Sequence, residues 1–169
     1  MTDSWVVLGI SAAITVGIQF CGFVVAYILK TETFFDILGG INFLTLGVYS
    51  ALAGPNWGED SRKIACSVIF FCSRLWLLLF LAWRAYDRGG DSRFEEWIDK
   101  FWTFLGVWMF QAVWVFVISL PVVFVNSSSY NTDFSAFDYV TIVGFGLGVL
   151  IGEFLSVINL NLARYPSVS

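Results

Sequence analysis

Histidine is absent from this sequence, and charged residues are few. The absence of histidine excludes His-based metal sites and Ser-His or Cys-His catalysis. Charged residues make up 13% of the 169 residues, about half the share found in soluble domains, whereas hydrophobic residues make up 58%. This composition argues against a soluble domain. It favours a protein whose apolar side chains face a lipid bilayer.

Cysteine and basic residues are also scarce. Cys21, Cys66 and Cys72 lie in apolar stretches without metal-ligand spacing, so we interpret them as buried thiols and expect no metal site. The net charge of -4, with no basic stripe, argues against nucleic acid as a partner.

Five apolar stretches have about the length that a membrane-crossing helix needs, roughly 20 residues. We therefore predict an all-α, polytopic membrane bundle that forms one transmembrane domain over residues 1–169. The predicted spans are residues 5–29, 37–54, 64–83, 101–125 and 137–158. Pro55 ends the second span, and Pro121 predicts a kink in the fourth.

A short interfacial helix is predicted before the fourth span. Ser92 and Glu95 fit a capping box that opens it. Its apolar residues recur at helical spacing and are Phe94, Trp97, Ile98, Phe101 and Trp102. This pattern is typical of a segment lying on the bilayer surface.

Basic residues flank the spans unequally. One side carries Lys30, Arg84, Arg88, Arg93, Lys100 and Arg164. The other side carries only Arg62 and Lys63. The positive-inside rule then places the N-terminus in the lumen or outside, and the C-terminus in the cytosol.

Each predicted span contains one strongly polar residue. These residues are Gln19, Asn42, Arg74, Gln111 and Glu153. All lie roughly 8 to 15 Å from the cytosolic end of their spans, at 1.5 Å per residue, and Asp36 lies at that boundary. Polar groups at this depth are costly, so we predict that they face a polar cavity open to the cytosol. Arg74 and Glu153 are expected to pair. Two interpretations stay open: a pair that only sets helix register, or a cavity for an anionic or polar ligand.

Glycines recur on one face of the fifth span. Gly144, Gly148 and Gly152 are four residues apart, a spacing that allows another helix to approach closely. This face is a candidate contact for a membrane-protein partner.

Several short motifs follow one another in the order of a known family. They are Thr31–Asp36 (TETFFD), Ser73–Leu75, Arg84–Phe94 (RAYDRGGDSRF), Phe110–Ala112, Leu120–Pro121 and Gly152–Glu153. Over roughly residues 25–154 the chain resembles the uncharacterised membrane family related to steroid 5α-reductases, the DUF1295 group.

The resemblance implies a bundle of membrane helices that reduces a carbon–carbon double bond of a lipid or sterol-like substrate with NADPH. It also suggests the endoplasmic reticulum or another endomembrane. The cofactor-binding positions that it suggests are Arg74, Gln111 and Glu153 in the spans, with Asp91 and Arg93 in the loop. It assigns no catalytic residue.

The sequence departs from the family after Glu153. The family continues there with a polar stretch and a further C-terminal half important for the nicotinamide cofactor, so we expect this chain to be truncated. Three functions stay open: a reductase, a non-catalytic membrane scaffold or partner subunit, and a small transporter or channel. The last is least favoured because five spans show no inverted repeat.

Overall fold

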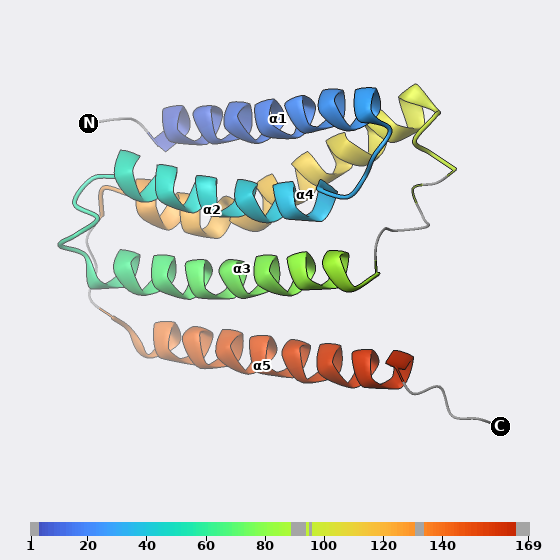
Figure 1. Cartoon of the computed structure of the whole chain (residues 1–169). Coiled ribbons are helices and arrows are strands. Elements are labelled where there is room, and N and C mark those ends of the chain that lie inside the picture. The colour runs from blue at the N-terminus through green and yellow to red at the C-terminus, as the bar shows by residue number, and fades with distance from the viewer. Residues whose placement is uncertain (1–3, 89–93, 95, 131–133, 165–169) are drawn as a thin grey trace. The chain divides into compact units, whose positions relative to one another are not determined.

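The structure is a computed structural model that describes residues 4–88, 94, 96–130 and 134–164. It leaves undescribed the side chains of residues 84, 85, 87, 88, 153, 156, 157 and 159–164. The described part contains five α-helices and no strand (Figure 1). They are α1 (Ser4–Leu29), α2 (Phe35–Ala53), α3 (Ser61–Arg88), α4 (Phe101–Ser127) and α5 (Ala136–Arg164). The all-α prediction is confirmed.

The chain forms two compact units, residues 1–132 and 133–169. In the first unit α2 is central and packs against α1, α3 and α4 (Figure 1). One apolar core cluster includes Val7, Phe43, Leu46, Phe70 and Val115. A second cluster consists of Phe23, Ala26, Phe94, Phe104 and Trp108. In the second unit, Ser135 and Asp138 cap the start of α5, with Ser135 Oγ donating to Asp138 Oδ2 at 2.7 Å.

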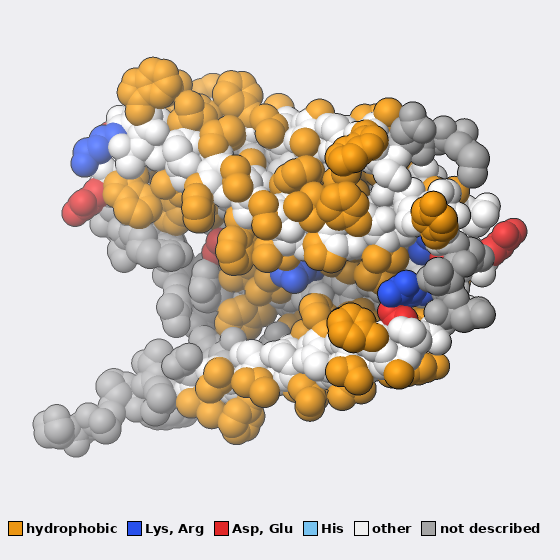
Figure 2. All heavy atoms as spheres, turned by 180° about the vertical axis from the view of Figure 1, so that it is seen from behind, with side chains coloured by type: hydrophobic (Ala, Val, Ile, Leu, Met, Phe, Trp, Pro, Cys, Tyr) orange, Lys and Arg blue, Asp and Glu red, His pale blue; other side chains and the backbone are white. Residues whose placement is uncertain are grey.

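Four helical segments in the described residues are long and apolar enough to cross a membrane: α1, α2, Ser61–Trp83 of α3, and α4. Large hydrophobic side chains are exposed along them, as the orange surface in Figure 2 shows, and a bilayer would cover this surface. The multi-pass membrane prediction is therefore confirmed. The apolar part of α5 in the described residues is shorter, Ala136–Gly152, so a fifth span stays a prediction.

The loop between α1 and α2 starts with a left-handed residue. Lys30 has φ 50°, and the Thr31 N–H donates to the Ala26 carbonyl at 3.0 Å. This is the Schellman type of helix end, which satisfies one of the last carbonyls of α1. Lys30 Nζ also pairs with Asp99 at 3.0 Å, so the loop is joined to the segment before α4.

The predicted interfacial helix is not among the five α-helices of the described part. In its place, residues 96–99 form a turn in which the Trp97 and Ile98 N–H groups donate to the Phe94 carbonyl. Phe94 is only 5% exposed because it packs into the second core cluster instead of lying on the bilayer. Ser92 and Glu95, the predicted capping box, lie outside the described residues.

The cysteines are less buried than predicted. Cys21 and Cys72 are exposed on the apolar surfaces of α1 and α3, and Cys66 is half-buried. The apolar stretches that contain them face outward as well as inward, because a lipid-facing helix can be apolar on every side.

Candidate functional site

Three of the predicted polar residues are buried where α1, α2 and α4 pack together. We call Gln19, Asn42 and Gln111 the carboxamide layer. Asn42 Nδ2 donates to the Thr15 carbonyl of α1 at 3.3 Å, and Gln111 Nε2 donates to the Phe35 carbonyl of α2 at 3.0 Å. Both bonds join neighbouring helices inside the membrane.

Gln19 lies at the same level as the other two amides. It is one turn beyond Thr15 on α1 and therefore on the same helix face. Gly22, three residues further along that face, packs directly against Leu38 of α2 and Trp108 of α4. Gln19 thus lies between two points where α1 contacts α2, and it is fully buried.

Several polar atoms of this layer have no hydrogen-bond partner among the described residues. They are Gln19 Nε2 and Oε1, Asn42 Oδ1 and Gln111 Oε1, together with the nearby indole nitrogen, Trp108 Nε1. Gln19, Asn42 and Trp108 are 0% exposed, and Gln111 is 9% exposed. A buried polar atom without a partner costs about 1–3 kcal/mol, so this concentration in one place needs an explanation.

The packing around the layer is tight. A Cβ added at Gly39 would overlap Gln111 Nε2, so the amide of Gln111 lies against the backbone of α2. On one side of the layer the Trp108 ring contacts Phe34, Phe35 and Phe104, with centroids 5.9, 5.0 and 6.2 Å away. A bulky group could enter here only if the helices separated.

Arg74 lies elsewhere, between α2 and α3. Its guanidinium carbon is 4.8 Å from the Phe43 ring centroid and 5.5 Å from that of Phe70, so it makes cation–π contacts to both rings. Its Nε has no hydrogen-bond partner in the described structure. The predicted polar residues therefore form two groups, because successive faces of α2 point to different neighbours.

The remaining predicted site residues do not join either group. Asp36 is half-buried in the first turn of α2. Asp91 and Arg93 lie outside the described residues, as does the side chain of Glu153. The predicted pairing of Arg74 with Glu153 and their role in cofactor binding stay predictions. So does a docking role for the face of α5 that carries Gly144, Gly148 and Gly152.

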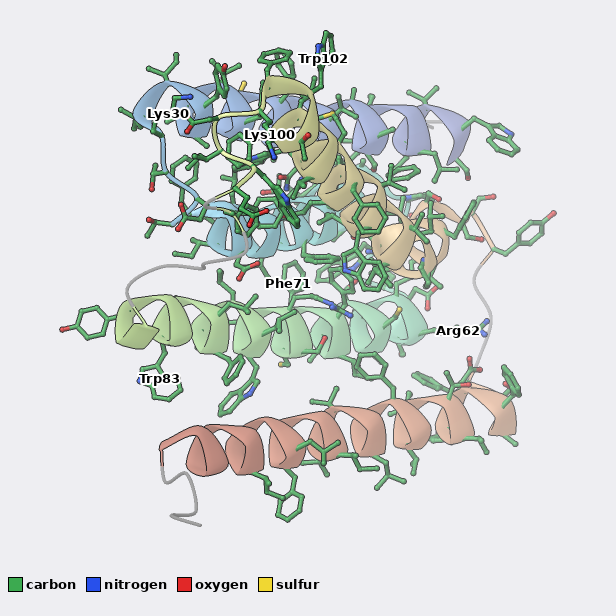
Figure 3. The ribbon with its side chains drawn as sticks, turned by 90° about the vertical axis from the view of Figure 1, so that its right-hand side faces the viewer. Lys30, Arg62, Phe71, Trp83, Lys100 and Trp102 are labelled. Carbon is green, nitrogen blue, oxygen red and sulfur yellow. The ribbon has the colours of Figure 1, made fainter. Side chains whose placement is uncertain are left out.

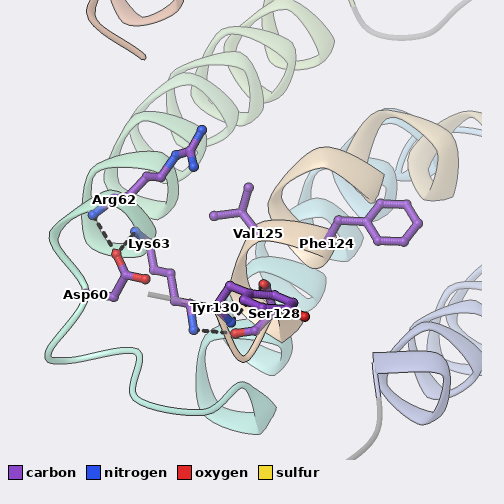
Figure 4. A pocket seen from close by; sticks show the side chains of 7 residues that line it. All are labelled: Asp60, Arg62, Lys63, Phe124, Val125, Ser128 and Tyr130. Atoms are coloured by element: carbon purple, nitrogen blue, oxygen red, sulfur yellow. Dashed lines mark hydrogen bonds between the residues drawn. The ribbon is translucent and has the colours of Figure 1, made fainter. Parts of the chain in front are cut away.

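A pocket of about 300 Å³ opens at the opposite end of the first unit (Figure 4). Its lining residues are Asp60, Arg62, Lys63, Phe124, Val125, Ser128 and Tyr130. Lys63 is 2% exposed, and its Nζ donates to the Pro55 and Ser128 carbonyls at 2.7 Å each. Asp60 Oδ1 accepts from the backbone N–H of Arg62 at 2.9 Å and so caps α3. Sequence reasoning missed this pocket, although an Asp directly before an apolar span, here Asp60, is a typical helix N-cap.

The buried polar groups near this pocket contrast with the carboxamide layer. Asn126 Nδ2 donates to Ser50 Oγ at 3.0 Å and to Ser67 Oγ at 3.1 Å. Trp57 Nε1 donates to the same Ser67 Oγ at 3.0 Å. This network connects α2, α3 and α4, and its buried amide finds partners, whereas the amides of the layer keep unused donors and acceptors.

Three of the basic residues that predict the orientation are labelled in Figure 3 and lie at opposite ends of the first unit. Lys30 and Lys100 lie towards the same end as Trp83, and Arg62 lies at the other end (Figure 3). The carboxamide layer lies nearer the Lys30 end, because Phe23 and Phe104, which frame it, are close to that loop. The lumenal and cytosolic assignment itself rests on the charge bias alone.

The fold and the buried polar groups define a multi-pass α-helical membrane protein with a polar layer inside its bundle. The chain belongs to the DUF1295 family, described as "Protein of unknown function (DUF1295)", whose model matches residues 22–157. That match includes Asn42, Arg74 and Gln111, while Gln19 precedes it. No curated protein and no solved structure matches the chain.

Proposed function

We propose that the protein is a membrane-embedded reductase of the steroid 5α-reductase type. It binds NADPH from the cytosolic side and reduces a carbon–carbon double bond of a lipid or sterol-like substrate, in the endoplasmic reticulum or a related membrane. Bound NADPH would supply the hydride. The protein's own residues would hold the anionic and polar parts of the cofactor and exclude water.

The observation that carries this proposal is that Arg74, inside a predicted span, has no anionic partner among the described residues. A cation inside a membrane span is costly unless it has a polar or anionic partner. No carboxylate among the described residues pairs with Arg74, and its Nε is without a hydrogen bond. The guanidinium fork binds carboxylate and phosphate groups through paired hydrogen bonds, and NADPH carries several phosphate groups. Gln111 belongs to the carboxamide layer, so its part in cofactor binding stays a separate prediction.

NADPH binding to the full chain in lipid nanodiscs tests the proposal, with cofactor fluorescence as the readout. We expect Arg74→Leu to weaken binding roughly tenfold or more, because truncating one partner of a buried charge pair costs about 2–5 kcal/mol. Arg74→Lys keeps the charge but loses the planar fork, so it should retain part of the affinity. Mass spectrometry of a lipid extract incubated with the protein and NADPH would then identify a product that is heavier than its substrate by two hydrogens.

Lys30→Ala is the control, because it also removes one positive charge, but an exposed one that already pairs with Asp99. It should leave NADPH affinity unchanged. A well-folded wild-type sample that does not bind NADPH contradicts the proposal.

A second candidate is a non-catalytic membrane scaffold or partner subunit. The contacts of Arg74 with Phe43 and Phe70 favour it, because they give the guanidinium a structural role without any ligand. In that case Arg74→Leu would change thermal stability. NADPH would not alter the melting temperature of the wild type or of Arg74→Leu. A partner protein would copurify from native membranes.

A further inference from the structure

The unpaired atoms of the carboxamide layer point to a ligand of a particular kind. The layer joins three helices, and its amides are at least nine-tenths buried. Elsewhere in the first unit the buried amide of Asn126 bonds to Ser50 and Ser67, so this fold is able to satisfy a buried carboxamide. The unused groups at Gln19, Asn42 and Gln111 are therefore a local property of the layer.

The charge of the site restricts the ligand first. The three carboxamides and the Trp108 indole are all uncharged, and Arg74 belongs to the separate contact with Phe43 and Phe70. A charged group here would lie in the membrane interior without a counter-charge among these residues, which is costly. The occupant is therefore uncharged.

The hydrogen-bonding pattern restricts it further. The unused donors are Gln19 Nε2 and Trp108 Nε1, and the unused acceptors are the amide oxygens of Gln19, Asn42 and Gln111. A carbonyl group only accepts and would leave those three oxygens unpaired. A hydroxyl group accepts from one of the donors and donates to one of the three oxygens, so it matches the layer better than a carbonyl group does.

Packing limits the size of the occupant. Gly22 and Gly39 allow α1 and α4 to lie directly against α2, so a bulky group could not enter the layer without moving a helix. Phe20 and Phe110, the chain neighbours of Gln19 and Gln111, are 49% and 71% exposed. The helices that carry the layer therefore also present apolar side chains to lipid, which is the source from which a hydroxyl group on a longer apolar molecule would come.

We infer that the carboxamide layer binds an uncharged O–H group inside the membrane, supplied either by a lipid hydroxyl or by water. Gln19 is the main ligand because both of its amide atoms are unused. Gln19 Nε2 donates to the hydroxyl oxygen, and the amide oxygen of Gln19, Asn42 or Gln111 accepts the hydrogen bond of the O–H group. This inference does not depend on the proposed reductase activity, because it invokes neither NADPH nor Arg74.

The test uses the full chain in phosphatidylcholine nanodiscs and two pairs of probes. Cholesterol is compared with its methyl ether, and octadecanol with its methyl ether, because each ether keeps the apolar body and loses only the O–H donor. The variant is Gln19→Met, which keeps the side-chain length and removes both hydrogen-bonding atoms. Ser119→Ala is the control, since Ser119 is buried in α4 but bonds within its own helix, to the Val115 carbonyl at 2.8 Å.

If a lipid hydroxyl is the ligand, an alcohol raises the melting temperature of the wild type and of Ser119→Ala by a few degrees or more, roughly as expected for ligand at many times its Kd. The matching ether does not, and Gln19→Met loses the response. If water is the ligand, no alcohol has this effect. Infrared spectra then show an O–H band of bound water that shifts in heavy water and is lost in Gln19→Met.

The inference is overturned if neither the alcohol-specific shift nor the bound-water band is seen, whichever way Gln19→Met moves the melting temperature. The amides would then satisfy one another, or the layer would be plain helix packing. The comparison of alcohol with ether, and the band itself, are measured on the wild type. They do not need the variant to fold.

Discussion

Single residues decide how closely the helices of this bundle approach each other. Gly54 ends α2 with an ordinary extended backbone, so its conformation does not require glycine. Glycine is required because of the neighbouring helix: a Cβ at this position would overlap the backbone carbonyl of Asn126 in α4. A main-chain atom within a helix cannot rotate away as a side chain does.

We therefore expect Gly54→Ala to lower the free energy of unfolding by about 1–3 kcal/mol, the usual cost of overpacking. Gly58→Ala is the matched control in the same loop, since no described atom lies within 4 Å of a Cβ built there. That variant should be neutral or slightly stabilising. Thermal unfolding in detergent, followed by circular dichroism, measures both, and equal stability of the two variants would contradict the assignment.

At the scale of helices, one buried lysine joins three of them. Lys63, in the first turn of α3, donates to the carbonyl of Pro55 just beyond α2 and to that of Ser128 just beyond α4. A cation is favourable next to carbonyl groups at helix C-terminal ends, where the partial charge is negative. The lysine thus closes the end of the bundle around the pocket.

Replacing Lys63 with methionine keeps the apolar stem and removes both hydrogen bonds. We expect Lys63→Met to cost about 2–3 kcal/mol of stability, since hydrogen bonds to charged groups are worth about 1.5–3 kcal/mol and the two carbonyls lose their partner. Lys30→Met removes an exposed ion pair to Asp99 and should cost about 1 kcal/mol or less. Urea or SDS titration of the two variants ranks them, and a Lys63 variant no less stable than the Lys30 variant would exclude the joining role.

At the scale of the whole molecule, the open question is how the chain crosses the membrane. The loop around Thr33 and the loop around Gly58 lie at opposite ends of α2, a helix long enough to span. The charge bias predicts that Thr33 faces the cytosol and Gly58 the lumen.

Labelling of single cysteines in sealed vesicles tests this topology. In a background with Cys21, Cys66 and Cys72 replaced by alanine, we expect a membrane-impermeant maleimide to label Thr33→Cys from the cytosolic side only and Gly58→Cys from the lumenal side only. Both positions are exposed, so accessibility of the side chain is not limiting. A tag at the C-terminus should share the side of Thr33 if α5 spans the membrane. A tag on the side of Gly58 would show that it does not.

The helices could be predicted closely from the sequence, because long apolar stretches have few alternatives to a helix in lipid. The bounds of α1, α2 and α4 lie within two residues of those predicted, whereas α3 extends further at both ends. Polar residues such as Ser61 and Arg88 continue α3 beyond its apolar part, since a helix does not end where its apolar run ends. The interfacial helix is predicted less accurately than the spans. Helical spacing alone does not distinguish a side chain that lies on the bilayer from one that packs into the core, as Phe94 does.

The sequence by itself determined that this protein is a membrane bundle with a few costly polar groups in its spans. Hydropathy and the cost of burying charge depend only on local composition. Which of those groups meet was decided by the tertiary structure, because the rotation of each helix about its axis depends on packing at residues such as Gly22 and Gly39. That packing brings Gln19, Asn42 and Gln111 into one layer and leaves Arg74 between Phe43 and Phe70, on another side of α2.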